Sequence, residues 1–206
     1  MSSDVEITYV NNSMNPATPT VFIFTKNRVP TFDVLKDGVA WKTMAKIGKG
    51  SSCKFTYPIR TTVQAMWGTC YKTHSLDARI GKRYKVEEDE TGIVLTPDGN
   101  ASQTTAIEVT NTVQVNGGIK AQLCKEGKVL VTKNVVAYNQ KATFILHPKI
   151  YWGVASEIQE GQFISSAVLD TDNFFKQELE GVTHARVTLN GNPHDGYHFV
   201  VDNNPT

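Results

Sequence analysis

The strongest constraint on the fold of this 206-residue chain is a motif that occurs twice. The first copy is Cys53–Gly68 and the second is Ala142–Ala155. Each has an aromatic-led apolar run, a proline, and a second extended run that carries Trp-Gly. Apolar runs rich in β-branched and aromatic residues, and bounded by proline and glycine, are typical of β-strands. The doubled motif therefore predicts two related halves, each built from strands.

The midpoint of the chain is Pro97–Gln103, the most polar and linker-like stretch. Ala106–Thr110, just after it, resembles Val5–Thr8 near the start of the chain. These observations predict pseudo-repeat halves 1–97 and 104–206. We expect the halves to join in a single β-sandwich domain covering 1–206, because either half alone would leave edge strands exposed.

Short extended runs separated by Gly, Asn and Asp turns fill most of the chain. Val5–Val10 alternates apolar and polar residues, which is the period of a strand with one buried face. Ile119–Lys125 faces Lys128–Lys133 across a Glu-Gly turn, as in a hairpin. The predicted fold class is all-β, an antiparallel two-sheet sandwich of jelly-roll-like design built from the two halves.

One short helix is predicted near 173–180. Asp172 or Asn173 can cap its start, and Gly181 fits a C-terminal stop. Such a helix has barely two turns, so packing of its apolar residues would have to hold it.

The formal net charge of +1 comes from 21 basic and 20 acidic residues. It argues against a general nucleic-acid partner, because phosphate binding requires clustered Lys and Arg. No apolar run reaches the length of a transmembrane segment, and the N-terminus resembles no signal peptide. We therefore expect a protein that is cytoplasmic as synthesised, with release by lysis or by an unconventional route left open.

The cysteines predict free thiols. Cys53, Cys70 and Cys124 form no Cys-x-x-Cys pair, so neither a zinc ribbon nor a redox motif is indicated. The sequence also has no phosphate-binding loop, no Rossmann glycine pattern and no nucleophile elbow. No cofactor is expected.

A metal site is the sharpest catalytic hypothesis. His184, His194 and His198 lie near the C-terminus with Asp195 among them, and imidazole and carboxylate groups are suitable ligands for zinc or iron. Their spacing matches no metal motif, so histidines of strands and turns are the favoured interpretation. A metal-dependent enzyme that uses these residues is kept as an alternative.

Aromatic residues are the candidates for ligand contact. Trp67 and Trp152 of the doubled motif are expected in the core, because a role common to both halves fits packing. The ligand-binding candidates in or beside the predicted strands are Trp41, Tyr71, Tyr151 and Tyr197. Tyr71 and Tyr151 are the better surface candidates among them.

These features favour a non-catalytic binding protein whose ligand is a carbohydrate or a membrane surface. A toxin-like or pore-forming role is the more specific membrane alternative, although no segment able to insert is evident. The remaining alternative is a structural, self-assembling protein that forms a homo-oligomer through exposed strand edges.

Overall fold

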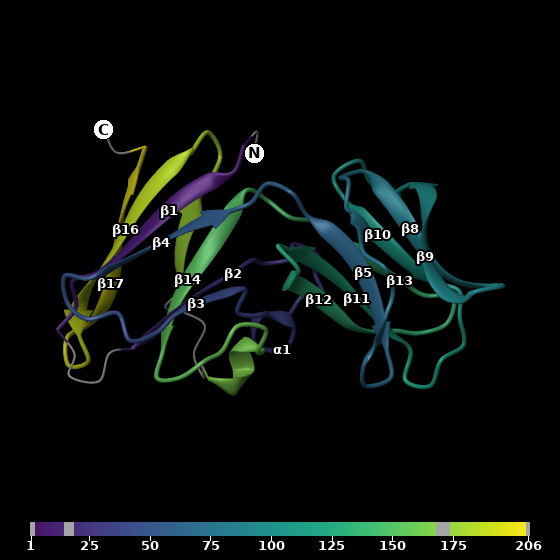
Figure 1. Cartoon of the computed structure of the whole chain (residues 1–206), viewed down its shortest axis with the longest axis horizontal. Helices are drawn as coiled ribbons and strands as arrows, with labels where there is room; N and C mark the ends of the chain where they lie inside the picture. The colour runs from purple at the N-terminus through teal and green to yellow at the C-terminus, as the bar shows by residue number, and fades with distance from the viewer. Residues whose placement is uncertain (1–2, 15–18, 168–173, 205–206) are drawn as a thin grey trace. The chain divides into compact units, whose positions relative to one another are not determined.

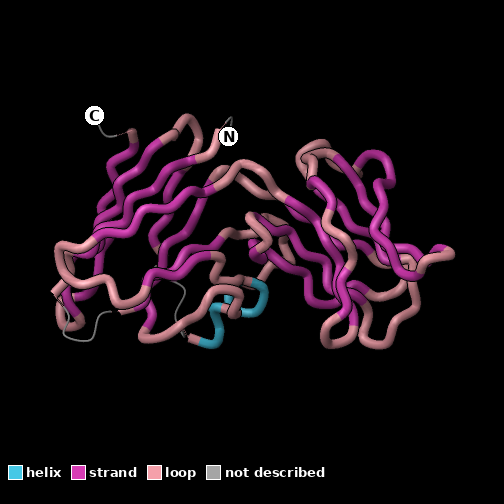
Figure 2. The backbone as a smooth tube through the Cα atoms, in the orientation of Figure 1, coloured by secondary structure: helices cyan, strands magenta, loops and turns pink. Residues whose placement is uncertain are grey.

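A computed structural model describes residues 3–14, 19–167 and 174–204. Strands dominate these residues (Figure 2). The chain forms two compact units, and neither is continuous in sequence. Unit 1 consists of Met1–Thr25, Ala40–Ile59 and Pro148–Thr206, and unit 2 consists of Lys26–Val39 and Arg60–His147.

Unit 1 contains eight described strands in two sheets (Figure 1). The first sheet has the order β17-β16-β1-β4, and the second has the order β15-β14-β2-β3. The strands are β1 (Val5–Asn11), β2 (Thr20–Phe24), β3 (Lys42–Met44), β4 (Ser52–Tyr57), β14 (Lys149–Ala155), β15 (Phe175–Glu178), β16 (His184–Asn192) and β17 (Gly196–Asn203). Strand β1 pairs in parallel with β16, and the other pairs are antiparallel.

Unit 2 has sheets of order β13-β10-β8-β9 and β12-β11-β5-β6, with the short β7 also paired to β5. Its elements are α1 (Val34–Asp37), β5 (Thr62–Trp67), β6 (Tyr71–Lys72), β7 (Leu76–Asp77), β8 (Lys82–Asp89), β9 (Gly92–Asn100), β10 (Ile107–Asn111), β11 (Ile119–Lys125), β12 (Lys128–Val136) and β13 (Lys141–Phe144). Its parallel pair is β10 with β8. The all-β prediction is confirmed.

The two units share one strand order, although their strands come from different parts of the chain. Strands β10, β11, β12 and β13 of unit 2 hold the positions of β1, β2, β3 and β4 in unit 1. In the same way, β5 corresponds to β14, β8 to β16 and β9 to β17. The short strands β6 and β7 together occupy the position of β15. The parallel pair falls at the same place in each unit. The strand set β1–β9, which we call repeat 1, is therefore repeated by β10–β17, which we call repeat 2.

Two buried asparagines show that the correspondence extends to single hydrogen bonds. Asn11 ends β1, accepts from the backbone N–H of Ser13 at 2.9 Å, and donates to the carbonyl of Ile47 at 2.6 Å. Asn111 ends β10, accepts from the N–H of Val113 at 2.9 Å, and donates to the carbonyl of Val136 at 2.9 Å. Each asparagine thus fixes the loop that follows its strand to the segment before β4 or β13.

The strands are exchanged between the repeats. Unit 1 combines β1–β4 of repeat 1 with β14–β17 of repeat 2, and unit 2 combines β5–β9 of repeat 1 with β10–β13 of repeat 2. The border between the units therefore does not fall at the polar stretch between the predicted halves 1–97 and 104–206. The prediction that residues 1–206 form a single domain depends on how the two units are joined. It stays a prediction.

Each unit is a sandwich with its own core. In unit 1, the ring of Trp152 on one sheet lies 6.2 Å from Tyr9 and 6.4 Å from Phe55 on the other. In unit 2, buried residues of both sheets form one cluster: Val63, Ala65, Tyr84, Val86, Leu95, Ile107, Val109, Val113, Ile119, Ala121, Leu123, Val131, Val136, Ala142 and Phe144. Alternation along each strand supplies these inward side chains.

The predicted helix near 173–180 is wrong where the structure describes it. Phe175–Glu178 is strand β15, with Phe175 opposite Trp152 and Gln177 opposite Ile150. A helix of two turns is marginal without tertiary contacts, and here pairing with β14 supplies the contacts instead. The proposed caps Asp172 and Asn173 lie outside the described residues. The helical segments found among the described residues are α1 and a 3₁₀ turn, Ile164–Ser166.

Candidate functional site

The four aromatic residues predicted to contact a ligand differ in exposure. Trp41 is 1% exposed and packs edge-on against Tyr57 in unit 1, at 5.1 Å between ring centroids, so it is a core residue. Tyr151 is half-buried and stacks on Phe24 at 5.3 Å, and Tyr197 is half-buried on β17. Tyr71, in unit 2, is 60% exposed.

Tyr71 stacks on Trp67 across the β5–β6 turn, with 5.9 Å between centroids and 20° between planes. Gly68 makes this turn with a φ of +58°, and a Cβ there would lie 3.3 Å from the Tyr71 ring. Trp67 is only half-buried, whereas Trp152 is fully buried. The predicted core role is therefore confirmed for Trp152, while Trp67 lies at the rim of the unit 2 core.

The three C-terminal histidines have ordinary strand and turn partners. His184 begins β16, where Nε2 lies 3.3 Å from a Glu6 carboxylate oxygen. His194 donates its backbone N–H to the Asn192 side chain in the β16–β17 turn, and His198 lies on β17. Among residues 3–14, 19–167 and 174–204, no three His, Cys, Asp or Glu side chains gather where they could hold a metal ion.

The clearest difference between the repeats is a segment of repeat 1, Lys26–Val39, which we call the insertion. It lies between β2 and β3, yet it belongs to unit 2. The equivalent strands β11 and β12 are joined only by Glu126 and Gly127, both with positive φ, in a tight turn. The insertion therefore has no counterpart in repeat 2.

The side chain of Asn27 attaches the insertion to the free edge of β13. Its Nδ2 donates to the carbonyl of Thr143 at 2.9 Å, and its Oδ1 accepts from the N–H of Ile145 at 2.9 Å. The N–H of Arg28 donates to the carbonyl of Ile145 at 3.0 Å. The amide of Asn27 thus takes the place of a neighbouring strand's peptide group along this edge.

Two further features fix the shape of the insertion. The Asp33 carboxylate caps α1 by accepting from the N–H groups of Leu35 and Lys36, at 2.9 and 3.2 Å. Asp37 accepts from the N–H of Asp33 at 3.0 Å. Phe32 packs against the unit 2 core, and Gly38 bridges to Val131 on β12.

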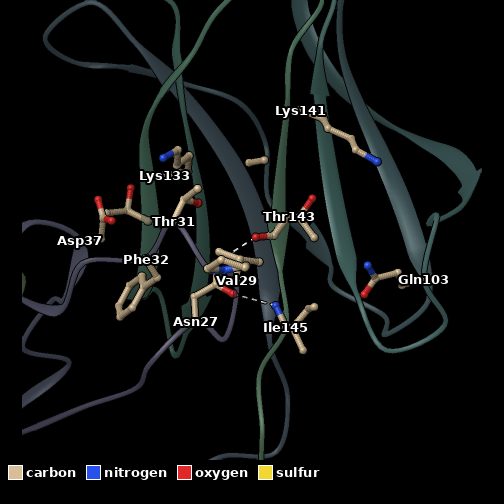
Figure 3. Close-up of a pocket in the computed structure, with 13 residues that line it drawn as sticks. Asn27, Val29, Thr31, Phe32, Asp37, Gln103, Lys133, Lys141, Thr143 and Ile145 are labelled. Carbon is tan, nitrogen blue, oxygen red and sulfur yellow. Dashed lines mark hydrogen bonds between the residues drawn. The ribbon is translucent and has the colours of Figure 1, made fainter.

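A pocket of about 320 Å³ lies between the insertion and the strands β12 and β13 (Figure 3). One wall is the insertion, and the others come from the two strands and the loop before β10. The lining residues are Asn27, Val29, Pro30, Thr31, Phe32, Asp37, Gln103, Thr132, Lys133, Lys141, Ala142, Thr143 and Ile145. The pocket is therefore built from residues of both repeats.

Lys141 is held rigidly beside the pocket. Its Nζ donates to Glu108 Oε1 at 2.7 Å and to Ser102 Oγ at 2.7 Å. The Glu108 side chain is 1% exposed. Burial would raise the pKa of this carboxyl, but hydrogen bonds from Lys141 and Ser102 outweigh burial and hold the pKa below its usual value. Glu108 therefore stays ionised and fixes the ammonium group.

Sequence reasoning missed this pocket. The sequence did contain a sign of the insertion. Residues 26–39 are an irregular stretch with Pro30, whereas the corresponding place in the second half is a tight Glu-Gly hairpin. Its lining residues carry no motif, and the aromatic candidates lie elsewhere.

Comparison with known proteins adds no assignment. No protein-family model matches the chain, no curated protein matches its sequence, and no solved structure matches its fold.

Proposed function

We propose that this is a non-catalytic binding protein and that the unit 2 pocket takes a carbohydrate of one or two rings. The observation that carries the proposal is a single pocket whose walls combine apolar residues with hydrogen-bonding groups that are held in place. Small-molecule sites occupy about 300–1,000 Å³ and combine apolar walls with a few oriented polar groups. At about 320 Å³, this pocket suits a ligand at the small end of that range.

The polar groups suit sugar hydroxyls, which both donate and accept hydrogen bonds. The Lys141 ammonium uses two of its three N–H donors on Glu108 and Ser102, which leaves one for a ligand. The hydroxyls of Thr31 and Thr143 can do both, as can the amide of Gln103. Because Lys141 is already held in place, binding costs little of its side-chain freedom.

The apolar part comes from the insertion and from β13. Phe32 is half-buried and held by the unit 2 core, with Val29 and Pro30 beside it in the chain and Ile145 opposite. A ring fixed in this way offers a flat apolar surface to the C–H face of a sugar. Figure 3 shows Val29, Phe32 and Ile145 around the Asn27 hydrogen bonds that anchor this wall.

The carboxylates support binding without hydrolysis. Glycoside hydrolysis generally uses two carboxyl groups on either side of the bond to be cleaved. Among the described lining residues, Asp37 is the one carboxylate, and its oxygen accepts the N–H of Asp33 at the start of α1.

The membrane surface is the second candidate ligand, and the exposed Tyr71 favours it. Tyr and Trp rings are common at membrane–water boundaries, and the exposed Tyr71 stacks on the half-buried Trp67. No helix in the described residues is long and apolar enough to cross a membrane.

A glycan array followed by calorimetric titration tests the carbohydrate site. Gln103→Ala and Thr31→Val should each weaken binding of an array hit at least several-fold, because each removes a hydrogen-bonding group from the pocket wall. Gln114→Ala, an exposed glutamine of unit 2 outside the pocket, is the matched control and should bind normally. A blank array with folded protein, or equal binding by all variants, would contradict the proposal. Sedimentation with liposomes that is lost in Tyr71→Ala would favour the membrane surface instead.

A further inference from the structure

One sheet of unit 2 carries basic residues without acidic ones. Its strands β12, β11, β5 and β6 contain no aspartate or glutamate, and their charged residues are Lys72, Lys120, Lys125, Lys128 and Lys133. The other sheet of unit 2 has charges of both signs and pairs them, as in Lys141 with Glu108 at 2.7 Å. The first sheet is therefore positively charged, although the whole chain is almost neutral.

Strand alternation brings two of these lysines into one exposed row. Val63 and Ala65 of β5 point into the unit 2 core, so the side chain of Met66 lies on the outer face of the sheet. Lys120 lies opposite Met66 on one neighbouring strand, and Lys72 lies opposite it on the other. Both lysines are exposed, and neighbouring strands are about 4.8 Å apart. An ammonium group therefore stands on either side of an apolar side chain.

Neither Lys72 nor Lys120 has an acidic partner in the part of the chain that the structure describes. Residues 61–76, 109–125 and 127–147, which supply these four strands and the loops beside them, include no aspartate or glutamate. Asp77 of β7 lies at the opposite end of β5, where it pairs with Arg60 at 2.7 Å. The acidic residues 88–90 belong to the β8–β9 hairpin of the other sheet. The row is therefore suited to an anionic partner.

Aromatic and apolar side chains border this row. The next pair along β5 and β6 is Trp67 opposite Tyr71, whose stacked ring is 60% exposed. On β12, Val136 is buried opposite Ile119, so Val135 lies on the outer face and is 61% exposed. We use the name basic face for the group Met66, Tyr71, Lys72, Lys120 and Val135.

We infer that the basic face binds a membrane surface that contains anionic lipid. Each lysine near such a surface strengthens binding about fivefold. Tyrosine and tryptophan rings are favoured at the headgroup boundary, and apolar side chains are buried there. A nucleic acid fits less well, because its binding depends on many phosphate contacts and this face offers only Lys72 and Lys120.

This inference rests on the second candidate ligand of the proposed function, the membrane surface, and it names the lipid class. It is independent of the carbohydrate site, because the basic face and the pocket share no residue.

Sedimentation with two kinds of vesicle tests the inference. One kind is phosphatidylcholine alone, and the other is an equal mixture of phosphatidylcholine and phosphatidylserine. Binding to the mixed vesicles should be roughly 25-fold tighter, from about fivefold for each lysine. Raising the salt from about 0.01 M to about 0.15 M should weaken it, because the screening length falls from about 30 Å to about 8 Å.

Substitutions locate the charges that matter. Lys72→Gln and Lys120→Gln should each weaken binding to the mixed vesicles about fivefold, and the double variant roughly 25-fold. Lys36→Gln is the matched control, because this side chain of α1 is 81% exposed and lies outside the basic face. It should bind as the natural protein does. Circular dichroism checks that each variant is folded.

A fluorescent label on Cys70 reports where contact occurs. Cys70 is exposed in the turn between Trp67 and Tyr71, and Cys124 is buried, so replacing Cys53 with serine leaves one reactive thiol. A polarity-sensitive label at this position should shift to shorter wavelength on the mixed vesicles. An unchanged spectrum during sedimentation would place the contact elsewhere and overturn the inference.

Three further results would also overturn it, in distinguishable ways. Equal binding to both kinds of vesicle, unchanged in the lysine variants, would keep the membrane as a ligand but remove the anionic lipid. Failure of the folded protein to bind either kind would remove the membrane candidate as well. Binding to a single-stranded oligonucleotide instead of vesicles, weakened by the same lysine substitutions, would identify a nucleic-acid face.

Discussion

The indole N–H of Trp152 donates a 2.9 Å hydrogen bond to the side-chain oxygen of Gln177 inside unit 1. Both residues are buried, and they come from the neighbouring strands β14 and β15. The bond satisfies the Trp152 N–H and the Gln177 oxygen where water is absent, and Gln177 Nε2 donates separately to Asn203 Oδ1 at 3.2 Å. The extended conformation of β15 places Gln177 beside the ring, so this bond joins the pairing with β14 in holding 175–178 as a strand.

Replacing Trp152 with alanine should therefore destabilise the protein by about 3–5 kcal/mol, since a large buried side chain is lost and Gln177 loses its partner. Trp67→Ala should cost clearly less, because Trp67 is half-buried at the edge of the unit 2 core. Urea denaturation of both variants measures the two changes in the free energy of unfolding. Equal losses would show that the rim position of Trp67 is wrong.

The equivalent asparagines should respond alike. Asn11→Ala removes three hydrogen bonds, two with Ser13 and one to the carbonyl of Ile47, and Asn111→Ala removes two, one from Val113 and one to the carbonyl of Val136. We expect a loss of about 1–3 kcal/mol in each case, the typical cost of an unsatisfied buried group. The exposed Asn12→Ala is the control and should change stability by no more than about 0.5 kcal/mol. A large loss in one variant only would argue against the correspondence of the repeats.

Acid should weaken unit 2 through Glu108. Its folded pKa lies below its ordinary value of 4.5, so the ionised carboxylate contributes stability that is fully present above that value. This stability is lost as the pH falls through the lower, folded pKa. Glu108→Gln should be less stable than the natural protein at neutral pH and should lose less stability on acidification. Denaturation midpoints between pH 7 and pH 3 test this, and parallel curves for the two proteins would contradict it.

Releasing Asn27 should loosen the insertion without unfolding the unit. Asn27→Ala removes the two side-chain bonds to Thr143 and Ile145 on the edge of β13. Limited proteolysis, followed by mass spectrometry, should then cut within 26–39 faster than in the natural protein. Arg28→Ala is the comparison, because its bond to Ile145 is made by the backbone and survives. Equal cleavage in the three proteins would show that Asn27 does not anchor this segment.

Local sequence pattern was sufficient for the strands but not for their partners. Alternation in Val5–Val10 and the Glu-Gly hairpin correctly indicated β1, β11 and β12. The doubled motif marked β4–β5 and β13–β14, which hold equivalent places. Alternation fixes which face of a strand is buried, but it does not say which of two similar copies lies beside it. The exchange of strands could not be predicted for that reason.

The errors have a similar cause. Asp172, Asn173 and Gly181 are good signals for helix ends, and they outweighed a short strand that depends on contacts with Trp152. Trp41 was predicted to contact a ligand because of its residue type, but its 1% exposure follows from tertiary packing alone. The pocket depends on Asn27 reaching residues more than a hundred positions away, and no local pattern reports such a bond.

Because of the exchange of strands, the two units cannot be completed in the order in which their strands are synthesised. Strands β1–β4 leave the ribosome first, but β14–β17, which complete their sheets, leave last. At about 5–20 residues per second, the N-terminal strands wait on the order of ten seconds with unpaired edges. The strands of unit 2 meanwhile emerge in one stretch and can fold in the interval. During that period the edges of the first four strands are open to pairing with strands of other chains.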